Sequence, residues 1–209
     1  AAAGVELYVR IRRGDEPHAE ILAQARELPA DLLVIRRRGK RGLLANMLVG
    51  EMVSRVVTHA PCNLLIASRS ARLWRRGVLA AVDAQAGARD IHVAIQAARL
   101  ARAFALPLRI VTVVAAPAQR EAAQALMAQM EPDLKAILGA ASLLNTDIRE
   151  GRAHDQLLSA AAHHGDDLIV IGRHTSTPRL GRARIGDTLH EVIGHAECPV
   201  WICAPAPGA

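Results

Sequence analysis

The sequence predicts an α/β fold: a doubly wound parallel five-stranded sheet, repeated in tandem with a truncated first copy. Three observations support this class. Apolar residues make up 51% of the 209 residues and aromatic residues only 2%, a balance typical of aliphatic strands covered by helices. Short apolar runs alternate with stretches of helical spacing. The segments ADLLVI (30–35) and DDLIVI (166–171) also align, in a register that several flanking residues keep.

A complete unit occupies the second part of the chain. Strands are expected at 77–84, 108–115, 145–149, 167–172 and 199–204. Helices are expected at 92–105, 119–144, 152–164 and 186–195, with a kink or break near Pro132 in the second of them. Strands and helices that alternate in this order form a parallel sheet with right-handed crossovers.

The first part of the chain contains only the later portion of that unit. Strands are expected at 5–11, 31–36 and 63–67, and helices at 16–27 and 45–59. Because residue 1 aligns with residue 137, residues 77–136 have no counterpart upstream. Three such strands leave an unpaired edge, so we expect completion by further chain or by a partner. The predicted domains are residues 1–69 and 77–209, joined by a linker at 70–76.

Composition narrows the function classes. The net charge of +6 favours anionic partners such as nucleotides, but equally fits ordinary solubility. No apolar run approaches the roughly 18 residues of a membrane span, and the opening AAAGVELYV lacks the pattern of a signal peptide. Three cysteines without a C-x-x-C pair predict reduced thiols in a cytoplasmic protein, with Cys62 and Cys198 buried and unreactive. The scarcity of stacking aromatic residues argues against nucleic acid as a partner.

Motifs of common enzyme classes are absent from the sequence. It contains no Walker A loop and no G-x-G-x-x-G, G-x-S-x-G or H-E-x-x-H pattern. Neither a catalytic triad nor a metal cluster can be inferred from the spacing of its polar residues. We therefore predict a protein that is not an enzyme and has no catalytic or metal-binding residues.

Three features resemble the universal stress protein family in its tandem form, over essentially the whole chain. They are a strand that ends in Asp83 (LAAVDA), a glycine-bearing loop after the fourth strand (169–188), and the closing strand CPVWIC. The resemblance implies an adenine nucleotide alpha hydrolase-like fold, with a five-stranded parallel sheet and helices on both faces. It also implies pairing through the last strand, as a homo-oligomer or as an intramolecular pseudo-dimer.

The family's nucleotide-binding signature, Gly-x2-Gly-x9-Gly-Ser/Thr, is only partly kept. The second copy has Gly172-x2-Thr175-x10-Gly186-Asp187-Thr188, and the first has the weaker Arg36-x2-Gly39-x10-Gly50-Glu51. The second copy is therefore the better candidate site, and the first copy is expected to be structural.

Two interpretations of this loop remain open. Gly172 lets a phosphate or sugar approach the backbone, and the helix after Gly186 offers an anion site with Thr188 as a hydroxyl donor. Alternatively, Asp187 caps its own helix, repels phosphate and fills the site from within. The loop also carries His174 and four arginines, which can bind phosphate, pair with Asp187 or remain solvated; these arginines are Arg173, Arg179, Arg182 and Arg184.

The remaining site residues follow the first two strands of the second copy. The resemblance implies that Asp83 contacts the nucleotide, and an acid there can accept from a ribose hydroxyl or an adenine amine. It can equally cap the helix that begins near Asp90. Val113 and Val114 lie where the family packs the base, although core packing explains them as well.

We therefore expect a non-enzymatic, cytoplasmic stress-response protein that binds an adenine nucleotide or another small anionic ligand, with ATP and magnesium as the candidate ligand. The predicted nucleotide-binding residues are Asp83, Val113, Val114, Gly172, Arg173, Thr175, Gly186, Asp187 and Thr188. Two alternatives remain: a nucleotide-free scaffold that acts through protein contacts, and a weak ATPase. No membrane partner is expected.

Overall fold

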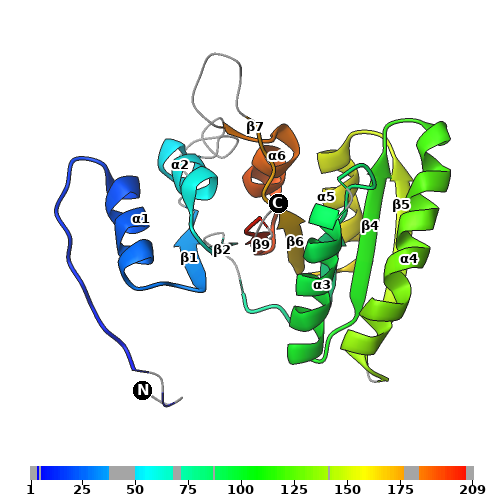
Figure 1. Ribbon diagram of the computed structural model, residues 1–209, viewed down its shortest axis with the longest axis horizontal. Coiled ribbons are helices and arrows are strands. Elements are labelled where there is room, and N and C mark those ends of the chain that lie inside the picture. Colours follow the sequence, from blue (N-terminus) through cyan, green and yellow to red (C-terminus); the bar gives the residue numbers. More distant parts are fainter. Residues whose placement is uncertain are drawn as a thin grey trace.

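The computed structural model describes residues 4, 6–37, 50–67, 72–86, 88–140, 142–176 and 184–205. Within them, one sheet of seven strands has the order β1-β2-β9-β6-β3-β4-β5 (Figure 1). Its strands are β1 (Leu32–Arg36), β2 (Asn63–Ala67), β3 (Val78–Ala81), β4 (Leu108–Val114), β5 (Leu144–Glu150), β6 (Leu168–Gly172) and β9 (Val200–Cys203). The α-helices are α1 (Pro17–Glu27), α2 (Glu51–His59), α3 (Ala88–Ala103), α4 (Arg120–Leu138), α5 (Ala153–His164) and α6 (Asp187–His195).

The second copy forms the expected doubly wound unit. Its five strands, in the order β9-β6-β3-β4-β5, are all parallel, which confirms the predicted fold class. Strands β3 and β6 are buried along their whole length, because helices cover both faces of the sheet. Leu79 and Ile169 face the core under α5 and α6, whereas Val78 and Leu168 face the core under α3 and α4.

The two copies join into one sheet through their final strands. Strand β2 pairs with β9 in antiparallel orientation, and Leu65 lies opposite Trp201. Helices α1, α2, α5 and α6 share one core across both copies. This arrangement matches the intramolecular pairing that the resemblance implied.

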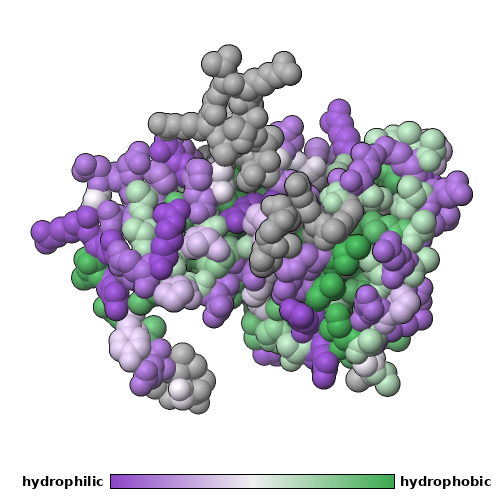
Figure 2. Space-filling view, viewed as in Figure 1, coloured by the Kyte–Doolittle hydropathy of each residue, from purple (hydrophilic) through white to green (hydrophobic). Residues whose placement is uncertain are grey.

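Among the described residues, helices cover the other face of the sheet only over the second copy. There α3 and α4 pack on the strands, and hydrophobic surface gathers between these two helices (Figure 2). In the first copy Val34 aligns with the buried Val170 but is 60% exposed. Strand β1 is therefore an open edge of the sheet with one uncovered face.

The strand expected at 5–11 does not form over its described part, residues 6–11. Leu7, Val9 and Ile11 alternate as in a strand, yet they are 85%, 82% and 90% exposed. The aligned strand of the second copy, β5, pairs only with β4. No described strand of the first copy corresponds to β4, so residues 6–11 have no neighbour with which to pair. The prediction of this strand was wrong for that reason.

Smaller differences concern the ends of helices. Helix α4 runs through Pro132 and ends at Leu138 rather than near 144, at Gly139 with its positive φ of 71°. Pro132 lies on the exposed side of α4, where water can satisfy the carbonyl that loses its helical hydrogen bond. The expected start of α2 at 45–49 lies outside the described residues. A short hairpin, β7 (Thr175–Ser176) and β8 (Arg184–Ile185), was not predicted.

The end of the expected linker packs against the second copy. Trp74 is buried and meets Phe104 edge-to-face, with ring centroids 5.2 Å apart. The Asp167 carboxylate accepts hydrogen bonds from the backbone N–H groups of Arg75, Arg76 and Gly77.

Among the helices that the structure describes, none has the length and apolar character needed to cross a membrane.

Candidate functional site

A pocket lies at the carboxyl ends of β3 and β6. This is the point at which the strand order of the second copy reverses, where doubly wound sheets bind their ligands. The cavity has a volume of about 430 Å³. Six of the nine predicted site residues line it: Asp83, Val113, Gly172, Gly186, Asp187 and Thr188.

Apolar side chains from both sides of the crevice form much of the pocket wall. Val111 and Val113 come from β4, Ile171 from β6, Leu157 from α5 and Leu189 from α6. Val113 is only partly buried, so its side chain is available to a ligand, whereas Val114 is 3% exposed and does not line the pocket. The two valines alternate across the strand, so only Val113 has a place in the site.

Asp83 shapes the turn after β3 rather than capping α3. Its Oδ1 accepts a hydrogen bond of 2.8 Å from the Gln85 N–H, and its own backbone N–H donates to Oδ2 of Asp90. The Asp83 side chain is exposed at the pocket rim. It is therefore free to accept a further hydrogen bond from a ligand.

Asp90 is a site residue that the sequence analysis did not assign. It lies in the first turn of α3, lines the pocket and is 2% exposed. Its Oδ1 is 3.1 Å from His174 Nε2, a distance that suits an ion pair with a protonated imidazole, but this oxygen makes no hydrogen bond. The pocket thus contains a buried carboxylate oxygen that can still accept a hydrogen bond.

The space next to Gly172 is used by the protein itself. A Cβ atom on Gly172 would lie 3.1 Å from His174 Nε2 and 3.1 Å from Val93. A side chain at this position would require the imidazole and Val93 to move by a few tenths of an ångström. The His174 carbonyl also accepts the Gly186 N–H at 2.9 Å, so His174 connects both glycines of the degenerate signature.

The N-terminus of α6 faces the pocket without a side-chain cap. Gly186 is the N-cap residue, and within the described residues the helix has no side-chain cap hydrogen bond. Asp187 is exposed at the first helical position. The prediction that Asp187 caps its own helix is therefore wrong: a residue inside the first turn cannot place its carboxylate over the amides in the way that an N-cap residue can.

Arg173 does not lie at the pocket, which corrects its assignment as a nucleotide-binding residue. Its Nη1 donates to the carbonyls of Ala60 (2.6 Å) and Val57 (3.2 Å), at the C-terminal end of α2 in the first copy. Partial burial lowers the pKa of Arg173. Since helix C-termini attract cations, the guanidinium is held by the neighbouring copy rather than by a ligand.

The first copy contains the same contact in reverse. Arg37, which aligns with Arg173, donates to the carbonyls of Gly194 and Ala196 at the end of α6. Burial lowers the pKa of Arg37 as well. The two arginines thus form a reciprocal pair of contacts between the copies.

The last predicted residue, Thr175, pairs with Ile185 in the β7–β8 hairpin and is not among the residues that line the pocket.

Charge within the pocket is mainly acidic. Among its described lining residues, the ionisable ones are Asp83, Asp90, His174 and Asp187, with no lysine or arginine. Groups of three or more metal-ligating side chains are not found in the described part of the chain. The described lining residues therefore present carboxylates, which accept hydrogen bonds from donors on a ligand.

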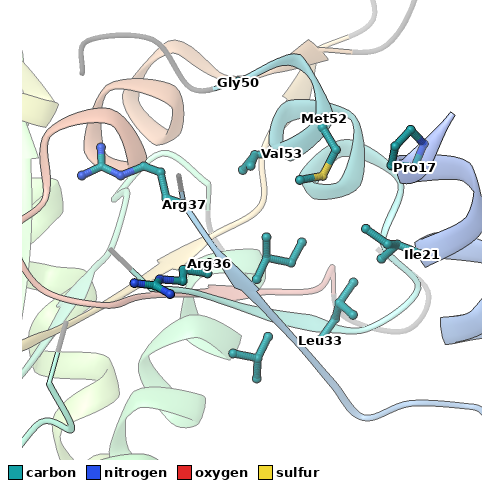
Figure 3. A pocket seen from close by; sticks show the side chains of 10 residues that line it. Pro17, Ile21, Leu33, Arg36, Arg37, Gly50, Met52 and Val53 are labelled. Carbon is teal, nitrogen blue, oxygen red and sulfur yellow. The ribbon is translucent and has the colours of Figure 1, made fainter. Parts of the chain in front are cut away.

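A larger cavity of about 890 Å³ lies in the first copy (Figure 3). Seven of its lining residues align with residues that line one wall of the second pocket. The first-copy residues are Pro17, Ile21, Ile35, Arg36, Gly50, Met52 and Val53, and they align in this order with Ala153, Leu157, Ile171, Gly172, Gly186, Thr188 and Leu189. The opposite wall, which β3 and β4 form in the second copy, has no described counterpart. The greater volume reflects this open side, and the acceptor corresponding to Asp83 is missing from the cavity.

The three cysteine thiols are poorly suited to act as nucleophiles. Burial raises the pKa of Cys198 to about 11 and that of Cys203 to about 12, and also raises the pKa of Cys62. Cys62 and Cys203 are buried, whereas Cys198 is intermediate. Because the thiolate is the reactive form, all three are expected to react slowly with thiol reagents.

The parallel sheet with helices on both faces, and the crevice at the reversal of its strand order, define a doubly wound α/β protein. The sequence model of the universal stress protein family matches residues 1–68 and 75–204. The chain belongs to the universal stress protein family, as the resemblance indicated.

Solved structures agree on the fold. The chain is similar to a protein of unknown function from Pseudomonas aeruginosa PAO1, with a TM-score of 0.70 and 22% identity over 92% of this chain and 69% of that one. A universal stress protein from Archaeoglobus fulgidus DSM 4304 gives a TM-score of 0.65 and 17% identity, over 90% and 65% of the two chains. A search of curated proteins found no match.

Proposed function

We propose that the second copy binds an adenine nucleotide or another small anionic ligand, and that the protein is a non-enzymatic, cytoplasmic regulator in the stress response. One observation carries this proposal: a single pocket joins the exposed acceptor Asp83 to the uncapped N-terminus of α6. An acid after the first strand suits a ribose hydroxyl or a base amine. The helix N-terminus suits a phosphate.

The apolar wall supplies the third element that a nucleotide needs. The half-buried Val113, with Leu157 and Ile171, offers a surface for the base between β4, α5 and β6. No metal cluster is found among the described residues, so magnesium would be held by the phosphates of a bound nucleotide. Thr188 remains as a hydroxyl donor near the first turn of α6.

Thermal stabilisation tests the proposal, with AMP and ATP–magnesium as probes. At a concentration a hundredfold above Kd, the ligand should stabilise the folded protein by about 2.7 kcal/mol. The variant Asp83→Asn keeps an oxygen for the Gln85 N–H but loses the charge, so it should weaken the effect. Asp133→Asn, an exposed position on α4, is the matched control. No shift at millimolar concentrations of either probe would refute nucleotide binding and favour the scaffold.

A weak ATPase is a second candidate because of one observation, the approach of His174 to Asp90 within the pocket. A carboxylate that orients an imidazole is a common arrangement for a general base. Phosphate release from ATP that stops in His174→Ala, but persists in Asp133→Asn, would support this activity. If the wild-type protein releases no phosphate above background, the protein is a binder only.

A further inference from the structure

The geometry of the pocket points to a ligand with little phosphate charge. We propose that affinity decreases as phosphates are added, in the order adenosine, AMP, ATP, because the site hydrogen-bonds a nucleoside and repels a polyphosphate. This inference rests on the proposed function, and it narrows what the pocket recognises from a whole nucleotide to the nucleoside part of one. It depends on three features of the pocket: Asp90, the imidazole beside Gly172, and Asp187.

The first feature is the buried acceptor. Asp90 is 2% exposed, lines the pocket and has an oxygen that makes no hydrogen bond. This oxygen lies 3.1 Å from His174 Nε2, and an ionised carboxylate oxygen can accept more than one hydrogen bond, so a ligand hydroxyl or amine that reaches it gains a charge-assisted hydrogen bond. A phosphate oxygen at the same place carries no donor and adds like charge.

The second feature is the imidazole beside Gly172. In a phosphate-binding turn, glycine leaves room for the ligand to approach the backbone. Here that room is in contact with His174, whose Nε2 lies 3.1 Å from the position of a Cβ on Gly172 and 3.1 Å from Asp90 Oδ1. A phosphate chain can reach Gly172 only if it displaces the imidazole from Asp90.

The third feature is Asp187 at the start of α6. The amides of this turn have no side-chain cap, which alone would favour an anion. Asp187 places a carboxylate at the first position of the same helix and lines the pocket. Together with Asp83 and Asp90, it makes three carboxylates among the described lining residues, so each added phosphate meets more repulsion.

Calorimetric titration of the whole chain with adenosine, AMP and ATP, with and without magnesium, tests the proposal. The wild-type protein should bind adenosine most tightly and ATP least tightly. Asp187→Ser should raise the affinity for ATP relative to adenosine by about two- to fivefold, the usual effect of one charge at a helix terminus. Glu51→Ser changes the aligned first residue of α2 in the other copy and should leave this ratio unchanged. Melting curves establish that both variants are folded.

The outcomes separate this inference from the proposed function. If none of the three compounds binds, nucleotide binding itself is refuted. If ATP binds as tightly as adenosine, or if Asp187→Ser leaves the ratio unchanged, the pocket still binds nucleotides but the charge argument is wrong. In that case charges outside the described lining residues would decide affinity.

Discussion

Arg173→Met separates a structural role of this arginine from a ligand-binding role. The substitution keeps most of the apolar stem but removes the guanidinium that contacts the carbonyls of Val57 and Ala60. Both contacts use the same nitrogen, Nη1, so we count them as one charge-assisted hydrogen bond of about 1.5–3 kcal/mol. The field of the helix terminus adds about 0.3–1 kcal/mol.

Partial burial reduces this gain, because the guanidinium has lost some of its water, as its lowered pKa indicates. The expected net loss is therefore about 2 kcal/mol, which corresponds to a decrease in Tm of about 4–8 °C for a chain of this size. Arg37→Met, which removes the reciprocal contact with α6, should cost a similar amount. Arg99→Met, an exposed position on α3, should cost less than about 0.5 kcal/mol.

Urea denaturation at pH 7 measures the loss in stability, and titration with AMP and ATP measures binding. The structure predicts lower stability with unchanged affinity for both nucleotides. Unchanged stability together with a large loss of ATP affinity would refute this account and restore Arg173 as a phosphate ligand.

Three further predictions concern a thiol, an ion pair and the sheet edge. Burial raises the pKa of Cys203 from 9.0 to about 12, so between these two pH values only the unfolded chain releases the thiol proton. This release should lower the free energy of unfolding by about 1.4 kcal/mol at pH 10. Urea denaturation at pH 8 and 10 should show that Cys203→Ala lacks this component. Asp166→Asn removes the charge that pairs with Arg109 at 2.9 Å, where the side chains of Asp166 and Arg109 are 5% and 17% exposed. It should lower the free energy of unfolding by about 3 kcal/mol. Glu131→Gln, in an exposed pair, should lower it by under about 1 kcal/mol in the same denaturation assay. Val34→Lys on the open strand β1 should reduce any concentration-dependent association seen by sedimentation velocity; equal association by both proteins would exclude this edge.

Sequence reasoning located the pocket because parallel strands bring their carboxyl ends to one edge. Asp83, Gly172 and Gly186 were expected there from the element order together with the family resemblance, and all three line the cavity. The same reasoning could not position side chains that point away from the edge. Arg173 was considered for phosphate because it is one of the arginines of the loop after the fourth strand, although its side chain extends to α2.

The sequence did contain a signal for the true position of Arg173. Arg37 and Arg173 occupy the same place in the two copies, even though Gly172 is replaced by Arg36 in the first. An arginine that is kept where the ligand-binding glycine is lost serves something other than the ligand. The reciprocal contacts with α2 and α6 provide that explanation.

Asp90 could also have been recognised. It shares one face of α3 with Ala94, Ala97 and Ala101, at helical spacing, and all of these are buried. An acid on an apolar helix face requires a partner, which is a reason to consider it for the site. The strand expected at 5–11 shows the opposite limit. Its alternating pattern was typical of a strand, but pairing depends on a neighbouring strand that local sequence does not report.

The contact of Arg173 with α2 has a consequence for how the pocket responds to a ligand. The residue that immediately follows Gly172 at the pocket edge is fastened to the neighbouring copy, while β2 and β9 continue the same sheet between them. A shift of the backbone at Gly172 would therefore be transmitted to the C-terminal end of α2 in the first copy. Through this contact the first copy supports one edge of the pocket.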